Sequence, residues 1–146
     1  MKLKFRTSKV YNKRLYPDLT EENFELIQLN AKNFLKRYSK EIEKIVRLLP
    51  KVTGRKWPEI EGKEIEVYFV YWNITPFSHP LTLNVKKELL NMLVCLTHEL
   101  GHHLFKYSCV SKGEHKLIND WTEEIFKKLK IDTGDRIEKL REISER

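Results

Sequence analysis

The chain has little of what would mark it as a secreted or a membrane protein. Two cysteines in 146 residues, Cys95 and Cys109, are too few for a disulfide framework, and we expect both to be free thiols. The longest apolar run, around residues 89–96, is far too short to span a bilayer, and the first six residues lack the apolar stretch of a signal peptide. These absences predict a cytoplasmic protein that does not insert into a membrane.

Composition and length predict one compact domain over residues 1–146, because 40% hydrophobic content can fill a single core. Residues 1–60 carry 15 Lys and Arg against 7 Asp and Glu, so the first part of the chain is basic. A basic region can steer a protein toward nucleic acid. No nucleic-acid-binding motif accompanies the charge, and we favour a solvated, lysine-rich surface of the kind seen in heat-adapted proteins.

The pattern of apolar residues predicts a long first helix. Asp18 can cap it and Glu21 can close a capping box, after which apolar residues recur at three- and four-residue steps from Phe24 to Leu49. Pro50 is expected to end the helix. The segments 64–72 and 80–85 have the composition of strands and are predicted to pair as an antiparallel ribbon, with residues 3–7 as a possible third strand.

Three further helices are expected in the second half of the chain. The first spans about residues 85–106, with Asn84 as its expected cap, and is apolar nearly all round, as in a buried helix. The second spans about residues 115–130, and a short charged helix follows Gly134. The sequence therefore predicts an α+β fold with a long N-terminal helix, a small sheet of two or three strands, a buried helix and a following helix.

The buried helix carries the sequence His-Glu-Leu-Gly-His at residues 98–102. His98 and His102 lie about 40° apart around the helix axis, and two imidazoles so placed can hold Zn²⁺. Glu99 can act as general base toward a water molecule at the metal. His103 points about 100° away from His102, so we expect a structural role for it.

A catalytic zinc site normally has a third protein ligand, and the helix at residues 115–130 offers acids. With Leu117 placed at 0° on a helical wheel, Asp120 and Glu124 border the predicted buried face while Glu123 turns toward solvent. His115, at the expected helix start, is a further possible ligand. The residues alone leave Asp120, Glu124 and His115 open.

The motif at residues 98–102, followed by the acidic segment 118–126, resembles the gluzincin metallopeptidases, whose second helix carries an Asn-Glu-x-x-x-Asp pattern. The small size is most similar to the minigluzincins, compact soluble relatives of membrane peptidases. The resemblance implies Asp120 as third zinc ligand and Glu124 as support for a zinc-bound histidine, although the two acids are swapped relative to the family pattern. It also implies a zinc-dependent endopeptidase acting on peptides or proteins.

The sequence leaves two alternatives open: a regulatory or DNA-associated protease, and a module that binds zinc without catalysis. In the peptidase hypothesis, the segment 74–85 is the candidate edge strand for substrate. His79, Tyr107 and His115 are candidate hydrogen-bond donors to an oxyanion. The segment after residue 133 is expected to pack on the body through a narrow apolar stripe, with a cover over the cleft that restrains activity as the alternative.

Overall fold

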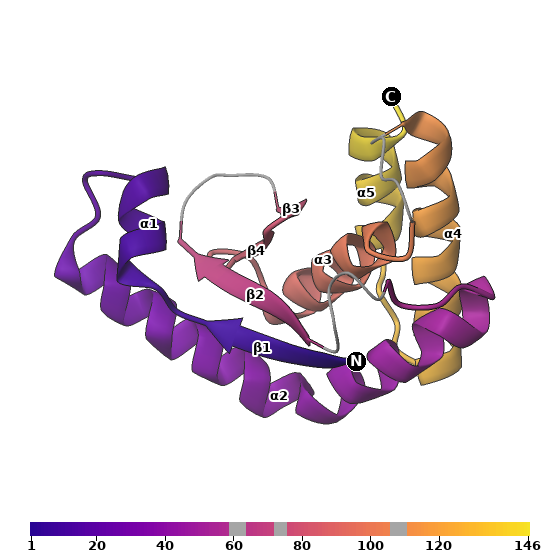
Figure 1. Cartoon of the computed structure of the whole chain (residues 1–146), viewed down its shortest axis with the longest axis horizontal. Helices are drawn as coiled ribbons and strands as arrows, with labels where there is room; N and C mark the ends of the chain where they lie inside the picture. The colour runs from indigo at the N-terminus through magenta and orange to yellow at the C-terminus, as the bar shows by residue number, and fades with distance from the viewer. Residues whose placement is uncertain (59–63, 72–75, 106–110) are drawn as a thin grey trace.

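The computed structural model describes residues 1–58, 64–71, 76–105 and 111–146 (Figure 1). These residues form an α+β fold, as predicted. Its elements in chain order are β1 (Lys2–Arg6), α1 (Lys9–Leu15), α2 (Glu21–Thr53), β2 (Glu64–Val70), β3 (Phe77–Ser78), β4 (Leu81–Asn84), α3 (Leu89–His102), α4 (Lys112–Leu129) and α5 (Arg136–Ser144). In the described ranges, none of the helices combines the length and the apolar character needed to cross a membrane.

The described strands form one sheet in the order β1-β2-β4-β3. The possible third strand near the start of the chain is confirmed as β1, which pairs parallel with β2. The predicted antiparallel ribbon is wrong, because β2 and β4 are parallel, with Val67 opposite Leu81. The antiparallel partner of β4 is β3, which precedes it directly in the chain and was not predicted as a separate strand.

Helix α2 runs along the whole length of the molecule (Figure 1). Its cap is Thr20, whose Oγ1 accepts from the Asn23 N–H at 3.1 Å, so the predicted cap at Asp18 is wrong. The helix also continues past Pro50 to Thr53, so the predicted end at Pro50 is wrong, and the Pro50 carbonyl still accepts from the Gly54 N–H at 2.9 Å. Gly54 ends the helix in the left-handed conformation, with φ of 68°.

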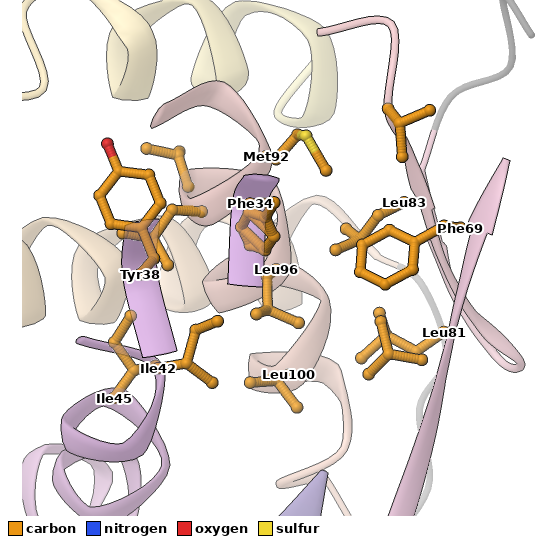
Figure 2. Close-up of a cluster of buried hydrophobic side chains, with 14 of the residues drawn as sticks. Phe34, Tyr38, Ile42, Ile45, Phe69, Leu81, Leu83, Met92, Leu96 and Leu100 are labelled. Carbon is orange, nitrogen blue, oxygen red and sulfur yellow. The ribbon is translucent and has the colours of Figure 1, made fainter. Parts of the chain in front are cut away.

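The apolar core lies where α2, the sheet and α3 meet (Figure 2). Each large side chain that is fully buried there contributes about 1.5–3 kcal/mol relative to an exposed position. The residues labelled in Figure 2 are Phe34, Tyr38, Ile42 and Ile45 of α2, Phe69, Leu81 and Leu83 of the sheet, and Met92, Leu96 and Leu100 of α3. The core therefore holds one side of α3 in place.

The boundaries of the helices that follow the sheet also differ from the predicted ones, and α3 ends at His102, short of the predicted end near residue 106. Helix α3 begins at Leu89, and Asn84 caps no helix: its Oδ1 accepts from the Lys86 N–H in a turn at 3.0 Å. Helix α4 begins at Lys112, where Ser111 accepts from the Glu114 N–H at 3.1 Å. Because α4 starts earlier than predicted, residues 112–114 also belong to this helix, which lies beside α3 and α5 (Figure 1).

Candidate metal centre

A close approach between α3 and α4 brings the side chains of the candidate centre together. Gly101 faces Ile118, and a Cβ atom added at Gly101 would lie 2.8 Å from the Ile118 Cγ2 atom. Atoms at that distance overlap, so glycine is the residue that allows this helix separation. The glycine inside the His-Glu-Leu-Gly-His sequence thus contributes to the site through packing.

Three histidines converge at this helix contact. The candidate ligand atoms of His98, His102 and His115 all lie within 4.8 Å of one another, and within the described ranges no other group of three His, Cys, Asp or Glu side chains meets this condition. The His98 ring centroid lies 5.1 Å from that of His102 and 5.5 Å from that of His115. His102 and His115 are 5.0 Å apart. Two candidate ligands thus come from α3 and one from α4.

Hydrogen bonds to acceptor oxygens on α4 fix the orientation of both α3 imidazoles. The His98 Nδ1–H donates to the Asn119 Oδ1 at 2.8 Å, and the His102 Nδ1–H donates to a Glu114 carboxylate oxygen at 2.7 Å. Burial, reinforced by the neighbouring His102, lowers the pKa of His98 to about 3, and burial also lowers the pKa of His102. Both rings are therefore neutral near pH 7, with the Nε2 lone pair left for another partner.

The three imidazoles fit a metal ion. Neutral imidazole nitrogen is a preferred ligand for zinc, and Zn–N distances of about 2.0–2.1 Å in a tetrahedral site separate the nitrogens by about 3.4 Å. Side-chain shifts on the order of 1 Å bring atoms that are within 4.8 Å of one another to that separation. Hydrogen bonding of Nδ1 to a carboxylate or carbonyl oxygen is the usual support of a metal-bound histidine.

Glu99 and the three histidines line one cavity of about 350 Å³. The Glu99 side chain is buried, and burial raises the pKa of its carboxyl group to about 8. Cys95 also lines the cavity, and burial raises the pKa of its thiol to about 11, which keeps the thiol protonated near pH 7. Glu99 is therefore a buried acid–base group facing this cavity, where Cys95 is a protonated neighbour and Lys87 also belongs to the lining.

Helix α5 forms one wall of the same cavity. Leu140, Ile143 and Ser144 line it from α5, and Ser78 lines it from the sheet edge at β3. The prediction that the end of the chain packs on the body is confirmed, because Leu140 and the buried Ile137 join the core. A restraining role for α5 remains a prediction.

Neither acid favoured as third ligand joins the histidines. The Asp120 side chain is 51% exposed and pairs with the Arg141 guanidinium at 2.9 Å, while Glu124 is exposed on the outer face of α4. The helical wheel for residues 115–130 placed Leu117 on the buried face, but Leu117 is 37% exposed. The buried face of α4 is centred nearer Ile118, which turns Asp120 and Glu124 away from α3.

The other candidates from the sequence lie around this centre. As predicted, His103 lies outside the cluster: its Nε2 donates to the Ser78 carbonyl at 2.6 Å and its ring stacks on His79 at 4.1 Å. His115 is placed among the possible ligands, whereas Tyr107 lies outside the described residues, as does Cys109.

Sequence reasoning missed the roles of Glu114 and Asn119. Both are buried polar residues of α4, and each holds one histidine of α3. The available signal was helical spacing, since residues 114, 115, 118, 119 and 122 share one face when the helix begins before residue 114. Placing the helix start at His115 concealed that face.

Comparison of the chain with models of protein families, with curated proteins and with solved structures found no match. The functional interpretation of this chain therefore depends on the geometry and chemistry of its own residues.

Proposed function

We propose that the protein is a zinc-dependent endopeptidase with His98, His102 and His115 as its zinc ligands. The observation that carries the proposal is the position of Glu99, an acid–base group, in the same cavity as the three histidines. A catalytic zinc site needs three protein ligands and an open coordination position beside such a group. The ligand set in this proposal differs from the two histidines and one acid that the gluzincin resemblance implies.

The roles of the chain's own residues follow from this arrangement. When bound, zinc supplies Lewis acidity, which makes water acidic enough to react near neutral pH and polarises a carbonyl group. Burial favours the neutral form of Glu99, whereas a bound cation would favour its carboxylate, the form that accepts a proton. As the carboxylate, Glu99 takes the proton of the attacking water as the new C–O bond forms. It then gives that proton to the amine as the C–N bond breaks. Asn119 and Glu114 keep His98 and His102 directed into the centre.

A peptide substrate is favoured by the sheet edge beside the cavity. The predicted edge segment 74–85 is only partly at the edge, because β4 lies between β2 and β3. In the described part of the sheet the outer strand on this side is β3, and Ser78 of β3 also lines the cavity. An extended peptide can bind such an edge through main-chain hydrogen bonds with little sequence specificity.

The test compares Glu99→Gln with the unmodified protein and with Glu124→Gln, a control on the exposed face of α4. Each protein is stripped with a chelator, reloaded with zinc and assayed on casein. We expect Glu99→Gln to retain zinc and to lose activity by about 10²–10⁴-fold, because it lacks the general base. The control should remain active.

Zinc binding without casein cleavage by the unmodified protein would contradict the peptidase proposal and favour a module that binds zinc without catalysis. Equal cleavage by Glu99→Gln and the unmodified protein would contradict the role of Glu99 and indicate a contaminating protease. A chelator-treated sample without added zinc serves as the blank for both comparisons.

A further inference from the structure

Asn119 joins the candidate metal centre to the last helix of the chain. Its side chain is fully buried, with 0% exposure. On one side its Oδ1 accepts from the His98 Nδ1–H. On the other side its Nδ2 donates to the Ser144 Oγ at 3.0 Å and to a Glu145 carboxylate oxygen at 3.1 Å. Both amide hydrogens are therefore directed toward residues at the end of α5.

The partners at α5 allow only one orientation of this amide. A carboxylate accepts hydrogen bonds and cannot donate them, so Glu145 requires the NH₂ group of Asn119 to face it. The Ser144 hydroxyl donates its own hydrogen to the Leu140 carbonyl at 2.7 Å, so toward Asn119 it too accepts. A flipped amide would place its carbonyl oxygen against the carboxylate and its NH₂ group against His98.

The amide orientation in turn determines which His98 nitrogen carries the hydrogen. The Asn119 Oδ1 can only accept, so the His98 Nδ1 must be protonated and the Nε2 keeps its lone pair. The flipped amide would favour hydrogen on Nε2, and a protonated Nε2 cannot bind a metal ion. The orientation seen in the structure is the one that makes His98 a ligand.

Glu145 is itself held in place by charge. It is partly buried, with 22% side-chain exposure, and its carboxylate accepts from the Arg141 Nη1 at 3.3 Å. The other terminal nitrogen of Arg141 pairs with Asp120 at 2.9 Å and with Glu123 at 3.0 Å on α4. The end of α5 is thus attached to α4 at the level of Asn119.

We propose that Ser144 and Glu145 are positioning residues of the metal centre, acting on His98 through Asn119. Packing of α5 against α4 is then a condition for tight metal binding. This inference rests on the three-histidine centre of the proposed function but not on peptidase activity, and it is tested by metal affinity alone.

The experiment measures the zinc affinity of the full chain by competition with a chromophoric chelator. Asn119→Ala should weaken zinc binding by about 10–100-fold, the usual effect of losing the hydrogen-bond partner of a metal-bound histidine. Glu145→Ala should weaken zinc binding by up to about tenfold, since Glu145 contacts Asn119 and not His98 itself. Glu145→Gln keeps an acceptor oxygen and should fall between Glu145→Ala and the unmodified protein.

Glu142→Ala is the matched control, because Glu142 is an exposed residue of the same helix, and it should bind zinc like the unmodified protein. The double variant Asn119→Ala/Glu145→Ala separates positioning from general packing. If Glu145 acts through Asn119, the double variant binds zinc no more weakly than Asn119→Ala. Cobalt absorption spectra should also change in Glu145→Ala and stay unchanged in Glu142→Ala, because cobalt reports the ligand arrangement.

Additive losses in the double variant, or equal zinc affinity of Glu145→Ala and Glu142→Ala, would overturn the inference while leaving the zinc site itself intact. A failure of the unmodified protein to cleave casein, with the expected order of zinc affinities, would overturn only the peptidase proposal. An unmodified protein that binds no zinc would overturn both.

Discussion

The two sides of helix α3 are held by different kinds of interaction. On the side facing α2 and the sheet, Met92, Leu96 and Leu100 pack among apolar side chains (Figure 2). On the side facing α4, His98 and His102 are held by single hydrogen bonds to Asn119 and Glu114. The apolar side depends on volume and area, whereas the polar side depends on particular atoms in particular orientations.

This difference separates stability from function along one helix. An apolar core tolerates exchanges that preserve volume, so many sequences can support the same helix position. The polar side has few alternatives, because a buried donor or acceptor that loses its partner costs about 1–3 kcal/mol. We therefore expect substitutions on the first side to change unfolding, and substitutions on the second to change metal binding at modest cost in stability.

The largest effect is expected from a cavity in the apolar core. Phe34→Ala should lower the free energy of unfolding by about 3–5 kcal/mol, because Phe34 is fully buried and packs edge-on against Phe69. Denaturant unfolding of the metal-free protein measures the change. Leu29→Ala, at a 53% exposed position of the same helix, is the control and should stay within about 0.5 kcal/mol. Similar losses in both variants would contradict the placement of this core.

The next largest effect is expected from metal binding on the side of α3 that faces α4. Zinc at 100 times its dissociation constant should raise the free energy of unfolding by about 2.7 kcal/mol, because it binds the folded chain. Thermal unfolding with zinc and with excess chelator measures this difference. The increment should vanish in the double variant His98→Ala/His102→Ala. A chelator-insensitive melting temperature of the unmodified protein would argue against a metal centre.

A smaller effect is expected at the close contact between α3 and α4. Gly101→Ala should cost about 1–3 kcal/mol and weaken zinc binding, because the added methyl group meets the Ile118 side chain and separates the helices. Gly113→Ala is the matched control, since its nearest neighbour beyond the adjacent residues is 3.9 Å away and alanine favours a helix. Equal stability and zinc affinity in the two variants would show that the close approach at Gly101 has no role.

The sequence predicted local structure better than pairing. The long helix, the strand candidates at 3–7 and 64–72, and the buried helix all follow from periodicity within one segment. The parallel pairing of β2 and β4 does not follow from periodicity. It depends on β3, a strand of two residues that leaves almost no periodic signal. Helix ends were also missed where a proline was tolerated near residue 50 and where Ser111 served as the cap.

The candidate site was predictable to the same extent. His98, Glu99 and His102 form a local motif on one helix, and the structure places them on one cavity. The remaining parts come from α4, and their contribution depends on which face of α4 meets α3. The helical wheel counted Leu117, which is 37% exposed, as part of that face, whereas the buried polar residues Glu114 and Asn119 mark the true contact.

In the proposed metal centre the third ligand is His115, and neither Asp120 nor Glu124 binds the metal. The most direct measurement compares the zinc affinity of His115→Ala with that of Asp120→Asn and Glu124→Gln. Loss of a direct ligand should weaken zinc binding by at least about 100-fold, and loss of either acid should leave it nearly unchanged. Zinc binding that survives in His115→Ala and collapses in Asp120→Asn or Glu124→Gln would contradict the three-histidine centre.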